Sequence, residues 1–278
     1  MNFSHMPCAC TIAGSDSGGG AGIQADLKTF AALGVWGCSV ITAVTAQNPE
    51  SVKGIWNMNN SAVACQMEAV MEDFNISAFK CGMLPSSDVI KVVSDCLPDD
   101  VPFVLDPVIV STSGKALSDD SAFNALKNFL VSKSTLITPN IPESCALSGF
   151  DRIEDTEDLI AAGKIILDMG AGNVLLKGGH MGGKVSEDLL LSESGIIRFS
   201  AERMPYDVHG SGCSLSSAVT AGLSKGLCIE DACREAKIFI NSAIKHAFIS
   251  KSGRHSINPL PINLFLSNNN NYIPKNQN

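Results

Sequence analysis

The sequence predicts an α/β fold built on a mainly parallel central sheet. Short apolar runs alternate along the chain with segments of about 10–15 residues that have helical periodicity, which is typical of crossover units. The run from Cys38 to Ala46 is apolar nearly throughout, as expected for a strand that is buried on both faces. Polar residues follow several of the apolar runs, and ligands bind at such strand ends in parallel sheets.

In the first part of the chain, each apolar run is separated from the next by a helical segment. Gly14 to Gly19 forms a Gly/Ser turn, and Ile23, Leu27 and Phe30 then recur on one helical face, with Gly34 as the stop signal. The expected elements are a strand at Cys8 to Ala13, a helix at Gly20 to Leu33, a strand at Cys38 to Ala46 and a helix at Ser61 to Phe74.

In the middle of the chain, prolines and caps mark the element ends. Ser86 is a good helix cap, Asp106-Pro107 and Pro139-Asn140 end strands, and Pro142 suits the first turn of a short helix. The expected elements are a strand at Ala78 to Gly82, a helix at Ser86 to Leu97, a strand at Phe103 to Leu105, a helix at Ser121 to Val131 and a strand at Leu136 to Thr138.

The last part of the chain predicts a hairpin and three further helices. Thr156 is the expected cap of the first of these helices. The expected elements are a helix at Thr156 to Met169, a strand at Val174 to Lys177, a hairpin of Leu189 to Leu191 with Ile196 to Phe199, and helices at Gly212 to Lys225 and Glu230 to Ile249.

No linker or internal repeat divides these elements, so we expect one domain over residues 1–263. The Asn-rich segment 264–278 lacks apolar periodicity, and we expect it to be a disordered tail.

Charge and cysteine content exclude several classes of protein. The net charge of −8 gives no sign of a basic nucleic-acid groove. No apolar run approaches the ~18 residues that span a bilayer, and Met1 to Met6 lacks the features of a secretory signal. The ten cysteines show neither C-x-x-C nor zinc spacing, so we expect free thiols in a cytoplasmic protein with no membrane or nucleic-acid partner.

Two glycine-rich stretches nearly match phosphate-binding motifs. Gly178 to Lys184 fits G-x-x-x-x-G-K, but Val185 replaces the hydroxyl residue that would bind Mg²⁺, and a hairpin follows instead of a helix. Gly20 to Ala25 fits G-x-G-x-x-A, but the next strand ends in Gln47-Asn48 and not in the acidic residue that binds a ribose. Neither motif is therefore interpreted as a nucleotide fingerprint.

A third glycine-rich stretch is more informative. His209 to Ser214 precedes a helix of small residues, so its N–H groups and the helix dipole would form an anion hole. Cys213 falls in the first turn, where a thiol is expected to have a lowered pKa.

Seven motifs, in order over roughly residues 8–250, together resemble the hydroxymethylpyrimidine/phosphomethylpyrimidine kinases of the ribokinase-like superfamily. Val208 and Ser211 replace threonines of the family pattern. The motifs are Ala13 to Lys28, Ser39 to Asn48, Lys80 to Leu84, Asp106 to Val108 with Ser113-Gly114, Thr138 to Glu143, Lys177 to His180 with Asp188, and His209 to Cys213.

The resemblance implies a three-layer α/β/α sandwich and a kinase activity with two phosphorylation steps. Such an enzyme phosphorylates 4-amino-5-hydroxymethyl-2-methylpyrimidine and then the monophosphate to the diphosphate, for thiamine biosynthesis. ATP is the co-substrate, Mg²⁺ is the cofactor, and a homodimer is the implied assembly.

The resemblance also assigns roles to single residues. On the catalytic side, Gly210, Ser211 and Gly212 would offer N–H groups to the transferring phosphate, and Cys213 would act as the base or position the alcohol. The implied substrate-binding residues are Gln47, Asp16, Ala21, Met83 and Val110. The implied nucleotide-binding residues are Lys177, Asn140 and Asp106, and the implied metal-binding residues are Glu143 and Asp106.

Two alternatives remain open from the sequence. Kinases of the same fold that act on pyridoxine, pyridoxal or pyridoxamine have closely related motifs, although Gln47 and Met83 favour the pyrimidine. A non-catalytic pyrimidine-binding protein is the other alternative. Asn140, Glu143, Lys177 and Cys213 argue against it, because a sensor needs no Mg²⁺–ATP apparatus.

Overall fold

The computed structural model describes residues 6–108, 120–178 and 183–260. The strands are β1 (Cys8–Asp16), β2 (Trp36–Gln47), β3 (Val52–Asn57), β4 (Ala78–Cys81), β5 (Phe103–Leu105), β6 (Leu136–Ile137), β7 (Val174–Lys177), β8 (Val185–Ser192), β9 (Gly195–Glu202), β10 (Val208–His209), β11 (Phe248–Ile249) and β12 (His255–Ser256). The helices are α1 (Gly22–Ala32), α2 (Asn60–Asp73), α3 (Ser87–Cys96), α4 (Asp120–Phe129), α5 (Ile141–Ser148), α6 (Thr156–Asp168), α7 (Ser211–Ser224) and α8 (Ile229–Lys245).

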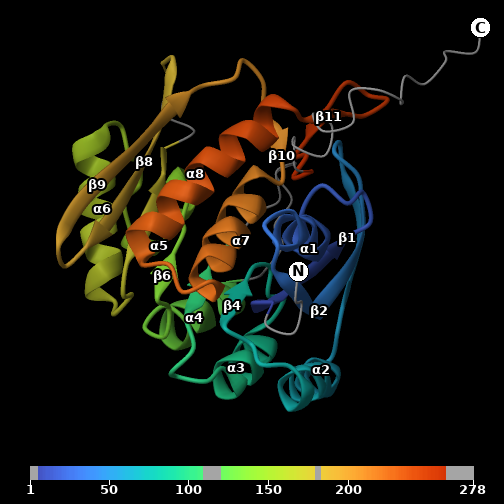
Figure 1. The fold of residues 1–278 in the computed structure, drawn as a ribbon. Helices are drawn as coiled ribbons and strands as arrows, with labels where there is room; N and C mark the ends of the chain where they lie inside the picture. Colours follow the sequence, from blue (N-terminus) through green and yellow to red (C-terminus); the bar gives the residue numbers. More distant parts are fainter. Residues whose placement is uncertain (1–5, 109–119, 179–182, 261–278) are drawn as a thin grey trace, which may run out of the picture.

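The described residues form a large sheet with the strand order β3-β2-β1-β4-β5-β6-β7-β8-β9 (Figure 1). The strands from β2 to β7 in this order pair in parallel, whereas β3 at one edge and β8 and β9 at the other pair antiparallel. The predicted α/β fold with a mainly parallel sheet is therefore confirmed. The carboxyl ends of the parallel strands lie along one edge of the sheet, where a ligand site is expected.

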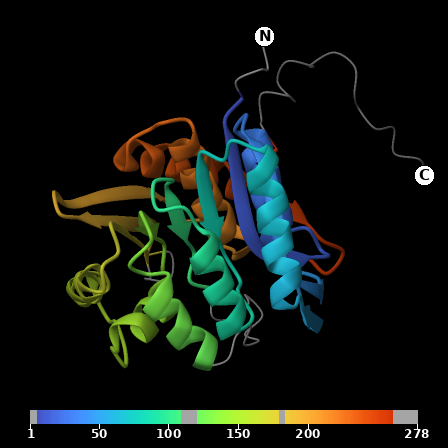
Figure 2. The same cartoon turned by 90° about the horizontal axis from the view of Figure 1, so that it is seen from below.

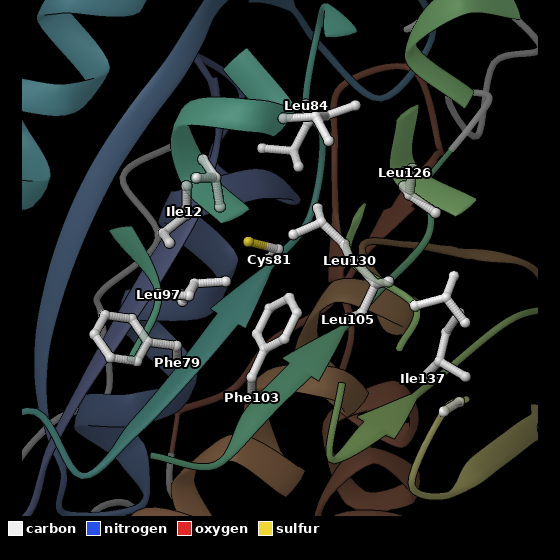
Figure 3. Packing of buried hydrophobic residues seen from close by; sticks show 14 of the residues in the cluster. Ile12, Phe79, Cys81, Leu84, Leu97, Phe103, Leu105, Leu126, Leu130 and Ile137 are labelled. Carbon is white, nitrogen blue, oxygen red and sulfur yellow. The ribbon is translucent and has the colours of Figure 1, made fainter. Parts of the chain in front are cut away.

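Helices cover both faces of this sheet, which gives the predicted three layers (Figures 1 and 2). Helices α2 to α6 pack on one face, and α1, α7 and α8 pack on the other. Figure 3 shows the first face, where Phe79 and Cys81 of β4 and Phe103 and Leu105 of β5 meet Leu130, which follows α4. Because side chains alternate along a strand, Lys80 points to the opposite face, toward α1 and α7.

Most predicted elements are present, with small shifts at their ends. Ser86 caps α3 as predicted, since its side chain accepts a hydrogen bond from the Val89 N–H. The predicted cap Thr156 is wrong, because the Asp155 carboxylate accepts the N–H groups at the start of α6 and Thr156 is the first helical residue. A strand begins at Val185, in agreement with the rejection of a P-loop.

Three further differences have physical causes. Strand β3 was not predicted, because its sequence contains Gly54 and its side chains are largely exposed. The predicted helix to Ile249 ends at Lys245, and β11 then pairs with β12 in a small sheet of order β10-β12-β11 that was also not predicted. Strand β2 is less buried than predicted, since Val44 is exposed, and only the edge strand β3 lies beyond it in the sheet.

The predicted tail 264–278 lies outside the described residues. In the part of the chain that is described, no helix has the length and apolar character required to cross a bilayer.

Candidate active site

The candidate site residues come from the carboxyl ends of the parallel strands and from the start of α7. Asp16 ends β1, Gln47 ends β2, Asp106 follows β5 and Lys177 ends β7. The structure gathers the predicted residues into two groups, one around Asp106 and one around Asp16. The start of α7 is near both groups.

The first group is centred on a buried ion pair. Lys177 Nζ donates to Asp106 Oδ1 at 2.8 Å, and the Asp106 side chain is 2% exposed. Asp106 also accepts hydrogen bonds from Ser216 of α7 and from Thr138 at 3.2 and 3.3 Å. Burial works against the charge of Asp106, but the cations of Lys177 and Lys80 hold its pKa below the ordinary value. Asp106 is therefore a fixed anion beneath the start of α7.

Glu143 joins this group through a capping box. The Asn140 N–H donates to Glu143 Oε2 at 2.8 Å, and the Glu143 N–H donates to Asn140 Oδ1 at 2.9 Å. Glu143 Oε2 lies 3.7 Å from Lys177 Nζ. Burial raises the pKa of Glu143 to about 7, against the effect of Lys177 and with a further contribution from the Asp106 charge. The predicted nucleotide-binding residue Asn140 thus holds the predicted metal-binding residue Glu143 in place.

The start of α7 has the geometry of an anion hole. Gly210 precedes the helix with a φ of +84°, and no side chain caps the first turn. A Cβ added at Gly212 would lie 3.3 Å from Lys177 Nζ, so the lysine ammonium lies beside this turn. A Cβ at Gly210 would overlap the Gly20 carbonyl oxygen, which means that only glycine allows the loop before α1 to pack here. Free N–H groups, a helix dipole and a cation therefore converge at one place.

The predicted lowering of the Cys213 pKa is wrong. Burial raises the pKa of this thiol to about 11, and the opposing effects of the Lys80 cation and a hydrogen bond from the Gly22 N–H do not compensate for it. Loss of water destabilises the thiolate by more free energy than the helix dipole contributes, because a helix terminus acts as only about half a charge. Cys213 is consequently a neutral thiol at pH 7.

Sequence reasoning missed the buried network below Cys213. The Asp26 carboxylate of α1 accepts hydrogen bonds from Lys80 Nζ, Thr11 Oγ1 and Ser217 Oγ, and the Lys80 and Asp26 side chains are fully buried. Ser217 lies one helical turn after Cys213, so the network joins β1, β4 and α1 to the first turns of α7. Polar residues within an apolar run, Thr11 and Lys80, were the available signal for this network.

The second group forms around Asp16, which shapes the loop before α1. Its carboxylate accepts backbone N–H groups from Gly18, Gly20 and Ala21 at 2.8–3.1 Å, and the residue is 3% exposed. Burial opposes the charge, but hydrogen bonds from His209 and from this loop hold the pKa of Asp16 below its ordinary value. Asp16 is therefore an ionised centre of the loop.

The His209 ring links Gln47 to the Asp16 carboxylate. The Nε2 atom of Gln47 is 3.4 Å from His209 Nε2, which is in turn 3.1 Å from Asp16 Oδ2.

Met83 is mostly buried, and a Cβ added at Gly14 would lie 2.9 Å from its Sδ, so the Met83 side chain packs on β1. Ala21 is partly exposed at the start of α1. Val110, Ser113-Gly114 and His180 lie outside the described residues.

The donor set of Asp106 and Glu143 fits a magnesium ion. Mg²⁺ binds through one or two carboxylates together with waters and substrate phosphates. Burial raises the pKa of Glu143 and the Asp106 charge adds to this effect, so an additional cation beside the two carboxylates would be favourable. Among the residues described, no cluster of three or more His, Cys, Asp or Glu side chains could hold a metal ion by itself.

Comparison with known proteins identifies the relatives of this chain. A family described as phosphomethylpyrimidine kinase matches residues 16–258. The hydroxymethylpyrimidine/phosphomethylpyrimidine kinase of Escherichia coli strain K12 is 41% identical over 255 residues, which are 91% of this chain and 96% of that protein.

Two solved structures are also similar to this chain. The ADP complex of Bacillus subtilis pyridoxal kinase has a TM-score of 0.86 at 34% identity and covers 94% of this chain and 100% of that one. The phosphomethylpyrimidine kinase of Clostridium difficile 630 has a TM-score of 0.75 at 41% identity and covers 85% of this chain and 99% of that one. The expected ribokinase-like arrangement is thus the fold that the chain shares with these kinases.

Proposed function

This chain belongs to the phosphomethylpyrimidine kinase family, and on that premise we propose that it phosphorylates 4-amino-5-hydroxymethyl-2-methylpyrimidine with ATP. The γ-phosphoryl group passes from ATP to the hydroxymethyl oxygen, which loses its proton, and ADP is released. A second ATP then phosphorylates the monophosphate, and the diphosphate serves thiamine biosynthesis. The observation that carries the proposal is the convergence of the start of α7 with Lys177, Asp106 and Glu143.

Phosphoryl transfer needs positioning and charge neutralisation, and the start of α7 offers both. The N–H groups of Gly210, Ser211 and Gly212 face the transferring phosphate, where the charge of the transition state gathers. Lys177 lies beside Gly212 and supplies a positive charge at the same phosphate. Its bond to Asp106 holds the ammonium in this position before the nucleotide binds.

Asp106 and Glu143 hold Mg²⁺ in this proposal, either directly or through water. The ion would neutralise the negative charge of the ATP phosphates and orient them. The residues contribute an already fixed geometry, because the capping box with Asn140 orients Glu143 and the bonds from Lys177, Ser216 and Thr138 orient Asp106.

Removal of the Asn140 cap tests this positioning. Asn140→Ala and Asn59→Ala each remove a helix cap, and each is expected to lose ~1 kcal/mol of unfolding free energy. Only Asn140→Ala is expected to raise the Mg²⁺ concentration at half-maximal rate, because Asn140 contacts Glu143 whereas Asn59 caps α2. Urea unfolding and a Mg²⁺ titration of the rate measure both effects. Equal Mg²⁺ requirements in the two variants would contradict the role of the cap.

At the start of α7, Cys213 either receives the hydroxyl proton as the thiolate, which is its minor form at neutral pH, or orients the alcohol as the neutral thiol. The thiol is close to the Lys80 cation and to the Gly22 N–H, both of which stabilise negative charge. Gln47, Asp16, Ala21, Met83 and Val110 bind the pyrimidine, and Gln47 offers both a donor and an acceptor to the aminopyrimidine edge.

The direct test is mass analysis of the product after incubation with ATP, Mg²⁺ and the pyrimidine alcohol. We expect first one and then two phosphate additions. Pyridoxine and pyridoxal are tested in parallel, because Bacillus subtilis pyridoxal kinase is similar to this chain in structure, although the pyrimidine kinases are more similar in sequence. Phosphorylation of the pyridoxine-type substrates alone would replace the proposal. Binding without phosphorylation would support a non-catalytic pyrimidine-binding protein.

Gln47→Leu is expected to lower kcat/KM for the pyrimidine about tenfold, because a polar edge of the substrate is left unpaired on binding. The variant is nearly isosteric, so packing changes little. Gln66→Leu is the matched control, since the amide of Gln66 bonds to the Ile41 backbone and not to the candidate site. Steady-state kinetics of both variants measure the effect, and an unchanged value for Gln47→Leu would mean that another residue reads the base.

We further propose a cytoplasmic homodimer. All ten cysteines are free thiols, which is typical of a reducing compartment. Trp36, Val44 and Trp56 are exposed on the neighbouring strands β2 and β3, at an edge of the sheet where a second copy would cover them. Light scattering on the purified protein tests the dimer.

A further inference from the structure

His209 is held rigidly between the two glycine-rich segments. Its backbone belongs to β10, which pairs with β12, and its carbonyl accepts the Ile257 N–H at 2.9 Å. The residue is 7% exposed, and a Cβ added at Gly20 would lie 2.7 Å from its Cδ2. The ring therefore fits against the loop before α1 and has little freedom to rotate.

The Nε2 atom of His209 faces two neighbours with different hydrogen-bonding needs. It lies 3.1 Å from Asp16 Oδ2 and 3.4 Å from Gln47 Nε2. Asp16 is ionised, since the hydrogen bonds around it lower its pKa, and an ionised carboxylate only accepts hydrogen bonds. His209 Nε2 must therefore carry a hydrogen and donate it toward Asp16.

This hydrogen decides the orientation of the Gln47 amide. An amide nitrogen opposite the ring N–H would place one donor against another, whereas the oxygen would accept the same hydrogen in a three-centre bond that it shares with Asp16 Oδ2. The two ends of an amide have the same shape, so the hydrogen-bond network determines which end faces the ring. With the oxygen toward His209, Gln47 Nε2 faces Thr45 Oγ1, which is 3.2 Å from the other end of the amide. The Thr45 hydroxyl can accept this bond because it donates its own hydrogen to the Ser15 carbonyl at 2.9 Å.

We propose that His209 is a positioning residue that locks the Gln47 amide with its oxygen toward the imidazole. One lone pair and one N–H of the amide then remain for the substrate, in a fixed order. They match a ring that carries an amino group next to an accepting ring nitrogen, which is the edge of a 4-aminopyrimidine. The proposal deepens the function proposed above and rests on it, because it takes Gln47 as the residue that reads the substrate.

Substrate preference tests the lock. The rates with the aminopyrimidine alcohol are compared with those of 5-hydroxymethyl-2-methylpyrimidine, which lacks the 4-amino group. In His209→Leu the nitrogen of the Gln47 amide is free to turn toward the Asp16 carboxylate. The preference for the amino compound is therefore expected to fall about fivefold, which is the size of one lost hydrogen bond. This loss is expected mainly in KM. His209→Gln places an N–H donor where Nε2 was, and it is expected to restore the preference. In a Gln47→Leu background, His209→Leu is expected to have no further effect on the preference.

A wild-type preference in His209→Leu, or an equal loss in the Gln47→Leu background, would overturn the proposal. If His209→Leu does not fold, nitrogen NMR of the wild-type protein decides the same question without any turnover. We expect His209 Nε2 to carry the hydrogen, and an unprotonated Nε2 would refute the lock. Failure of the proposed function would instead appear as a wild-type protein that phosphorylates neither pyrimidine, whatever the NMR result.

Discussion

Cys213→Ala is expected to lower kcat for the pyrimidine by ~10²–10⁴-fold, the range of a lost general base, without weakening the binding of ADP. The thiol lies in the first turn of α7, next to the N–H groups proposed to face the transferring phosphate. Its removal takes away the proton acceptor, while the Gly210–Gly212 turn and Lys177 remain. Cys233→Ala is the matched control, because Cys233 is a buried thiol on α8 and is expected to affect stability only. A Cys213→Ala variant that keeps more than about half of kcat would contradict the base role.

The pH dependence of kcat/KM tests the same role independently. Burial raises the pKa of the Cys213 thiol to about 11, so the thiolate is a minor form at neutral pH and increases as pH rises. If the thiolate is the base, the rate of the wild-type enzyme rises with pH between about 7 and 9, by nearly tenfold per unit. In Cys213→Ala this rise is expected to disappear. A flat wild-type profile would mean that the neutral thiol only orients the alcohol.

The elements that the sequence predicted well are those whose own residues carry the signal. Phe103–Leu105 is a three-residue apolar run ended by Asp106-Pro107, and the structure has this strand at the same residues. Strands β10 and β12 contain two residues each and lie about 45 positions apart, so no periodicity could announce them. They form because Val208 and His209 pair with His255 and Ser256 across the fold, and β12 also pairs with β11.

The candidate site was predictable in its members but not in their interactions. Strand ends indicated Asp106, Lys177 and Gln47, because parallel strands bring their carboxyl ends to one edge. The ion pairs and hydrogen bonds of the site join elements that are distant in the sequence, so they could not be predicted. Examples are the contact of Lys80 with Asp26 and that of His209 with Asp16. The pKa of Cys213 was predicted in the wrong direction for the same reason, since a sequence shows a helix start but not the depth of the thiol.

Substitution of Glu143 is expected to have the second large effect on activity, because this residue is buried and is proposed to bind Mg²⁺. Its pKa is raised to about 7 by burial, so at neutral pH the free enzyme contains both forms of the carboxyl group. Only the deprotonated form binds a cation. The affinity of the wild-type enzyme for Mg²⁺ is therefore expected to increase as pH rises from 6 to 8, with a lower Mg²⁺ concentration at half-maximal rate.

Glu143→Gln is expected to raise this Mg²⁺ midpoint by ~10–100-fold, the usual size of a perturbed metal site, and to remove its pH dependence. High Mg²⁺ should then recover part of the activity, because the defect lies in metal occupancy. The same titration of Cys213→Ala should recover nothing, since its defect lies in proton transfer. Glu157→Gln is the matched control, because Glu157 is also a carboxylate in the first turn of a helix but is exposed on α6. If Glu143→Gln and Glu157→Gln share the wild-type midpoint, Glu143 serves only as the capping partner of Asn140, and Asp106 is left as the carboxylate that faces the metal.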